Sequence, residues 1–114
     1  MKIEEYGTQA LSTMLADHGL SEDMTPALIS QIFGLVGESG EVAEKFKKII
    51  RDKQGALSGE DKAEILKELG DILWYVNSVA SLLGSSLEEV AKKNLDKVLS
   101  RKARGVTKGS GDNR

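Results

Sequence analysis

An all-α, four-helix bundle-like domain is the fold class that this sequence predicts, and three observations predict it. Apolar residues recur at helical spacing in four segments, and helix-capping residues stand between those segments. The chain has one proline and only 4% aromatic residues, which is atypical of a β-sandwich. A chain of 114 residues with 39% hydrophobic content buries a modest core, so we expect oligomerisation to complete the fold.

The first two helices are separated by the polar stretch LSEDM. The first is expected over about 2–18, with Gly19 as its stop. Its apolar face comprises Ile3, Tyr6, Ala10 and Met14. The second helix is expected to begin at Thr25 and Pro26, which suit the N-cap and the first helical position, and to run to about Asp52. Its expected core line is Leu35, Val42, Phe46 and Ile49.

The third helix is expected from a cap at or near Ser58 to about Leu83, where Gly84 ends it. Its expected core residues are Ile65, Leu66, Leu69, Ile72, Leu73, Val76 and Ala80. Ser86 and Glu89 predict a capping box for the fourth helix, which reaches about Ala103. Its expected core residues are Leu87, Ala91, Leu95 and Val98. We therefore expect one all-α domain over 1–104, followed by a basic, flexible tail over 105–114.

Charge is unevenly distributed along the chain. Residues 1–91 carry eight Lys/Arg against sixteen Asp/Glu, whereas residues 92–114 carry eight Lys/Arg against two Asp/Glu. No aromatic residues interleave with the basic ones, so we expect no nucleic-acid polymer as a partner. The chain has no cysteine, no apolar leader and no membrane-length apolar run, and we expect a cytoplasmic protein that makes no membrane contact.

Polar strips flank the apolar lines of the second and third helices. Glu38 and Glu41 lie on one side of the second helix, while Glu44 is expected on the opposite, solvated face. Glu68, Asp71 and Tyr75 share a strip on the third helix. Four carboxylates on two adjacent helices suit a hard cation, Mg²⁺ or Mn²⁺. Glutamates three residues apart are also common on exposed helices, where salt bridges explain them.

The fourth helix adds an amide and cations beside its apolar line. These residues are Asn94, Lys97 and Arg101, with Arg104 just beyond. Cations near a metal could neutralise a polyphosphate, which favours metal-assisted hydrolysis of a phosphoanhydride. Lys and Arg are also favoured at helix C-termini for dipole reasons alone, so this cluster has a purely structural explanation as well.

Two stretches together resemble a known family. GLVGESGEVAEKFKK followed by KELGDILWYV is similar to the MazG-like, all-α nucleoside triphosphate pyrophosphohydrolases, whose pattern is E-E-x-x-E, a spacer and E-x-x-D. Here Glu38 and Glu41 supply E-x-x-E, 26 residues intervene, and Glu68 and Asp71 supply E-x-x-D. NLDKVLSRKARG also resembles the last helix of the family, so the resemblance covers about 28–104. The departure is Gly37, where many members have the first of two adjacent glutamates.

The resemblance implies Mg²⁺-dependent hydrolysis of an NTP or dNTP between the α- and β-phosphates, giving monophosphate and pyrophosphate. It implies a homodimer or homotetramer whose sites borrow residues from a neighbouring chain. The implied metal ligands are Glu38, Glu41, Glu68 and Asp71, of which Glu38 and Glu41 are also the expected catalytic residues. The implied substrate contacts are Asn94, Lys97, Tyr75, Arg101, Arg104 and Lys53.

Two alternatives remain open on the sequence. One is a related all-α activity, hydrolysis of phosphoribosyl-ATP or dUTP. The other is a non-catalytic helical module for oligomerisation or partner binding, which the amphipathic helices and the basic end would equally suit.

Overall fold

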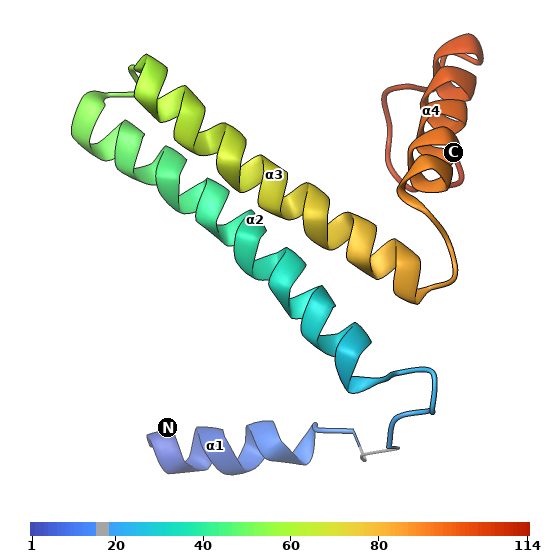
Figure 1. Cartoon of the computed structure of the whole chain (residues 1–114). Coiled ribbons are helices and arrows are strands. Elements are labelled where there is room, and N and C mark those ends of the chain that lie inside the picture. The colour runs from blue at the N-terminus through green and yellow to red at the C-terminus, as the bar shows by residue number, and fades with distance from the viewer. Residues whose placement is uncertain (16–18) are drawn as a thin grey trace.

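Four helices and no strands make up the part of the chain that this computed structural model describes, residues 1–15 and 19–114 (Figure 1). The all-α prediction is therefore confirmed. The helices are α1 (Ile3–Ser12), α2 (Pro26–Lys53), α3 (Gly59–Leu82) and α4 (Leu87–Ala103). Over the described residues, no helix combines the length and the apolar content needed to cross a bilayer.

The first helix is shorter than the segment predicted for it. α1 ends at Ser12, and the hydroxyls of Ser12 and Thr13 donate to the carbonyls of Gln9 (2.6 Å) and Ala10 (2.7 Å). Such local side-chain bonds compete with continuation of a helix. Residues 16–18 of the predicted segment lie outside the described residues, so its C-terminal part is not tested.

The starts of α2 and α3 follow the capping rules. The Thr25 hydroxyl accepts a hydrogen bond from the N–H of Leu28 (3.2 Å), and Pro26 occupies the first turn. Ser58 and Asp61 form a full capping box at α3, in which each side chain accepts the backbone N–H of the other at 3.0 Å. These local bonds satisfy backbone donors that a helix start leaves unpaired.

The start of α4 departs from its predicted capping box. Ser86 caps the helix by accepting the N–H of Glu89 (3.1 Å), as expected. The Glu89 carboxylate, however, accepts from the Ser85 hydroxyl (2.7 Å) instead of closing the box on the Ser86 backbone. The cap is therefore half of the box that the sequence predicted.

An antiparallel hairpin of α2 and α3 contains the core (Figure 1). Apolar residues recur every seven positions along its seam, as in a coiled coil. They are Leu28, Leu35, Val42 and Ile49 on α2, and Ile65, Ile72 and Val79 on α3. Leu28, Ile49 and Ile65 are less than 9% exposed, as is Ala80. The buried apolar residues of the structure therefore lie mainly between these two helices.

Several residues predicted to be core are not buried in a single chain. Phe46 is 40% exposed, and Leu66, Leu69 and Leu73 are 66%, 46% and 53% exposed. The leucines belong to a second apolar side of α3, which no other described helix covers. On α4, Leu95 and Val98 are 55% and 42% exposed for the same reason. One chain therefore does not bury them, and their place in the core of an oligomer stays a prediction.

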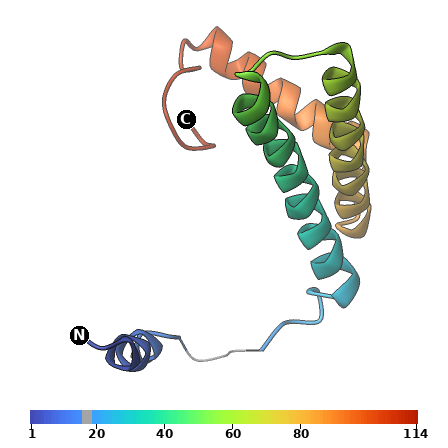
Figure 2. The same cartoon turned by 90° about the vertical axis from the view of Figure 1, so that its left-hand side faces the viewer.

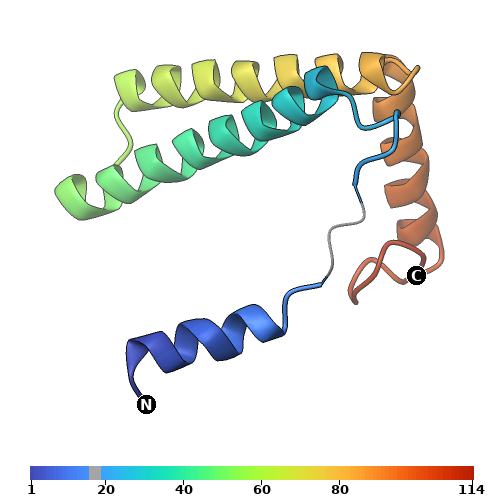
Figure 3. The same ribbon diagram turned by 90° about the horizontal axis from the view of Figure 1, so that it is seen from below.

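The other two helices stand away from the hairpin. α4 packs against α3 beside their connecting turn and then diverges, and α1 packs against none of the other described helices (Figures 2 and 3). The radius of gyration is 20.1 Å, against about 13 Å for a compact chain of this length. The exposed surface is 9296 Å², against about 6,100 Å² for a compact monomer of this mass. One chain thus supplies the four helices but leaves the bundle open.

Candidate functional site

Three carboxylates meet on the α2–α3 hairpin. One oxygen from each of Glu38, Glu68 and Asp71 lies within 4.8 Å of the other two. Glu38 and Glu68 are partly buried and Asp71 is exposed. Glu68 and Asp71 share a face because they are three residues apart on one helix. We refer to these three residues as the carboxylate cluster.

The seam of the hairpin places Glu38 in this cluster. Glu38 lies three residues after Leu35 and four before Val42, so it occupies a seam position between two apolar ones. The sequence placed it in a strip that flanks the apolar line. The packing brings it closer to α3, and this is why its carboxylate reaches the two acids there.

Crowding of like charges perturbs Glu38. Partial burial, followed by the negative charges of Asp71, Glu68 and Glu41, raises the pKa of Glu38 above its ordinary 4.5. Its charged form is therefore disfavoured by the surroundings. A cation bound among these oxygens would remove that cost, because it replaces repulsion by attraction.

Lys45 is a neighbour of the cluster that the sequence reasoning missed. Its ammonium lies 3.3 Å from a carboxylate oxygen of Glu68, and both side chains are largely covered. The sequence does contain a signal for this contact. Gln31, Glu38 and Lys45 are spaced seven residues apart, which places all three along one seam. Gln31 likewise accepts from Ser78 of α3 (2.8 Å). The seam thus alternates apolar layers with polar ones.

A hollow of about 300 Å³ opens beside the carboxylate cluster. It is lined by Glu38, Asp71, Trp74 and Tyr75. The two aromatic rings meet edge-on, with centroids 5.0 Å apart and planes at 85°. Gly34 makes room for Tyr75, because a Cβ at that position would collide with the ring. Trp74 lies at this hollow and is 59% exposed.

The remaining glutamates of α2 differ from one another. Glu41 lies one turn beyond Glu38, is exposed and is not among the three clustered acids. Its charge nevertheless acts on Glu38. Glu44, expected to be solvated, is half-exposed and pairs with Lys47 (3.2 Å) and Lys48 (3.8 Å). Within the described structure, three of the four predicted ligands are brought together.

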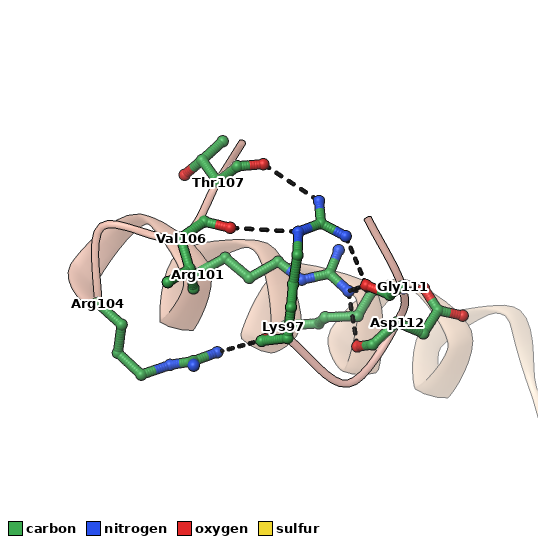
Figure 4. A network of polar contacts seen from close by, with 8 residues as sticks. Lys97, Arg101, Arg104, Val106, Thr107, Gly111 and Asp112 are labelled. Carbon is green, nitrogen blue, oxygen red and sulfur yellow. Dashed lines mark hydrogen bonds and ion pairs between the residues drawn. The ribbon is translucent and has the colours of Figure 1, made fainter. Parts of the chain in front are cut away.

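The predicted substrate-binding residues of α4 lie apart from the cluster, because α4 diverges from α3 after the turn. Three of them contact the C-terminal tail of their own chain instead (Figure 4). Lys97 lies 3.4 Å from the Asp112 carboxylate, Arg101 donates to the Asp112 carbonyl (2.6 Å), and Arg104 donates to that of Arg114 (3.0 Å). Asn94 is exposed.

Lys53 is also distant from the cluster. It stands fifteen residues beyond Glu38 on α2, which is about 22 Å along a helix axis. Its ammonium bonds both carboxylate oxygens of Asp61, at 2.8 and 2.9 Å. Lys53 lines another hollow, of about 210 Å³, at the closed end of the hairpin. In a single chain it therefore stabilises the start of α3.

Comparison with known proteins gives two findings. The sequence profile of the MazG nucleotide pyrophosphohydrolase domain matches residues 28–106, a span that contains α2, α3 and α4. The chain is also similar to the Gene 37 protein of Mycobacterium phage L5, with 43% identity over 114 residues and full coverage of both chains. No solved structure matches.

Proposed function

The chain belongs to the MazG nucleotide pyrophosphohydrolase family, and from that premise we propose that it hydrolyses nucleoside triphosphates. The proposed reaction cleaves an NTP or dNTP between the α- and β-phosphates and yields a nucleoside monophosphate and pyrophosphate. The observation that most supports this proposal is that the carboxylates of Glu38, Glu68 and Asp71 come together at the edge of an open hollow.

The donor set fits a magnesium ion. All three groups are carboxylates, the hard oxygen donors that Mg²⁺ prefers, and they come from two helices that pack against each other. The raised pKa of Glu38 supports the same assignment, since crowded carboxylates favour a bound cation. In this proposal Glu38, Glu68 and Asp71 hold Mg²⁺, and Mn²⁺ would fit the same donors.

Bound Mg²⁺ would supply positive charge that polarises a phosphoryl oxygen and lowers the pKa of a coordinated water. Glu41 is the proposed proton acceptor, because it is exposed and lies one turn from the cluster. It takes a proton from the attacking water as the new P–O bond forms. The bond to the bridging oxygen then breaks, and pyrophosphate leaves with that oxygen.

The hollow beside the cluster suits the nucleoside. Trp74 and Tyr75 offer apolar ring surface next to Glu38 and Asp71, so a base or sugar can lie there while the phosphates reach the metal. Gly34 leaves the space that the Tyr75 ring occupies, so the ring can lie against α2.

The proposed working form is a homodimer or homotetramer. The chain exposes about 3,200 Å² more than a compact monomer of its mass, and a standard interface covers about 800 Å² of each partner. A neighbouring copy could cover the exposed leucines of α3. It would also bring Asn94, Lys97, Arg101 and Arg104 from its α4 to the carboxylate cluster, where they would bind the phosphates.

The test is product analysis of the purified protein with each common NTP and dNTP, with and without Mg²⁺. Metal-dependent formation of monophosphate and pyrophosphate is the expected result. Formation of diphosphate and orthophosphate would overturn the proposed bond. No hydrolysis of any nucleotide, together with no Mg²⁺-dependent rise in melting temperature, would favour a non-catalytic helical module.

A further inference from the structure

The C-terminal tail folds back onto the last turns of α4 and is held there by hydrogen bonds (Figure 4). Arg101 donates to the carbonyls of Gly111 (3.2 Å) and Asp112 (2.6 Å). Arg114, at the end of the chain, donates to the carbonyls of Val106 (3.2 Å) and Thr107 (3.1 Å). Gly111 has φ +85°, a backbone conformation that other residues rarely adopt, so this fold of the tail depends on glycine. The tail therefore has a defined docked state.

A carboxylate of the docked tail pairs with two cations of α4. The Asp112 carboxylate lies 3.4 Å from the Lys97 ammonium and 3.5 Å from the Arg101 guanidinium. Lys97 above all, and Arg101 with it, hold the pKa of Asp112 below its ordinary value. A lysine and an arginine that together bind a carboxylate in this way are also suited to bind a phosphate group.

The docked state is also incomplete. The Arg101 side chain is only 10% exposed, yet its Nε has no hydrogen-bond partner among the described residues. The Asp112 side chain is 84% exposed, and ion pairs with such exposed partners hold weakly. A phosphate offers more acceptor oxygens than one carboxylate and two carbonyls, so it can satisfy Arg101 more fully.

We infer that the C-terminal tail is an intramolecular competitor for phosphate anions at Lys97 and Arg101. Docking of Asp112 and the tail carbonyls blocks these donors, and a di- or triphosphate must displace the tail to reach them. The assignment of this anion to the substrate rests on the proposed function. The competition itself does not, because inorganic pyrophosphate can probe it directly.

The experiment measures pyrophosphate affinity by calorimetry in full-length variants. Asp112→Asn and Arg114→Ala loosen the tail without touching Lys97 or Arg101, and each should tighten pyrophosphate binding about two- to fivefold, because less of the protein is in the closed state. Asp96→Asn is the matched control, since it makes the same charge change on α4 but its carboxylate pairs with Lys92 (2.8 Å). It should change affinity by less than either tail variant.

Hydrogen exchange gives a second readout on the unmodified chain. Pyrophosphate should speed amide exchange over residues 109–114, because the tail is released. Slower exchange would mean that the tail closes over the anion, and unchanged or weakened affinity in both tail variants would equally overturn the inference. If these results appear but no nucleotide is hydrolysed, the proposed function fails while the competition stands. Nucleotide hydrolysis with no change of affinity in the tail variants would instead overturn the competition and leave the proposed function standing.

Discussion

Two regions of the molecule differ in where their polar side chains find partners. One is the hairpin of α2 and α3, and the other is α4 with the C-terminal tail. Along the seam of the hairpin, polar side chains find partners on the other helix, as Lys45 does with Glu68 and Ser78 with Gln31. In α4, the side chains of Lys97 and Arg101 find their partners in the tail, ten to fifteen residues further along the chain. The hairpin contacts depend on tertiary packing, so they hold the carboxylate cluster in place. The α4 contacts are local and can be exchanged for others.

The largest effect should come from Glu41→Gln, which removes the proposed proton acceptor from the hairpin. We expect kcat to fall by about 10²- to 10⁴-fold. The melting temperature should hardly change, because Glu41 is exposed. Steady-state kinetics and thermal unfolding on the same preparation check both.

Glu44→Gln is the matched control for this variant. It lies one turn further along α2, and its partners are Lys47 and Lys48 rather than the cluster. Its kcat should stay within about twofold of the parent, as expected for a surface ion pair. Equal losses in both variants would remove Glu41 from the mechanism.

Mixing two inactive variants tests whether hairpin and α4 of different chains share a site. Glu41→Gln removes the proposed proton acceptor of the hairpin, and Lys97→Ala removes a proposed phosphate donor of α4, so each variant alone should be inactive. If each site combines two chains, random reassembly of equal amounts leaves about a quarter of the sites with both parts intact. Activity should then recover to about a quarter of the parent level after subunits exchange.

The control for the mixing experiment is the same measurement before exchange has occurred. Recovery should grow with exchange time and should be absent when the two variants are assayed immediately after mixing. If no activity returns after complete exchange, hairpin and α4 of one and the same chain serve each site.

Sequence reasoning predicted local features well because their causes are local. Thr25, Pro26 and Ser58 mark helix starts through bonds within three residues. The clustering of the three acids was also predictable. Residues three apart share one face of a helix, and a short loop makes the two helices of the hairpin antiparallel. The expectation that Glu41 joins the other three as a ligand stays a prediction.

The features that the sequence did not predict have a tertiary cause. Leu66 and Leu73 were assigned to the core because apolar residues at helical spacing normally face a partner, but no described helix of the same chain covers them. Arg101 was placed on a flank, yet it is 8% exposed because the tail folds over it. A tail without periodicity gives no signal of where it docks, so neither its contacts nor the burial of Arg101 could be predicted.

Gly34→Ala should damage the hairpin by a moderate amount. The added methyl group would collide with the Tyr75 ring, and overpacking of this kind costs about 1–3 kcal/mol. Gly37→Ala is the control on the same helix, where nothing lies within 4 Å, and it should raise stability by up to about 1 kcal/mol. Urea unfolding of both variants checks this. A destabilised Gly37→Ala would instead mean that another chain approaches that face.

The smallest effect concerns the closed end of the hairpin and appears as a pH dependence. The hydrogen bond from Lys53, followed by those from Ser58, lowers the pKa of Asp61 from 3.8 to about 2. Because the folded-state pKa is the lower one, Asp61 stabilises the protein fully above pH 3.8, and this contribution is lost as the pH falls towards 2. Asp61→Asn should therefore lower the melting temperature at pH 6, and the difference from the parent should vanish near pH 2. Lys53→Met should remove much of the same pH dependence, because Lys53 is the largest cause of the shift. If Lys53→Met leaves this pH dependence intact but weakens nucleotide binding, Lys53 serves the substrate rather than the start of α3.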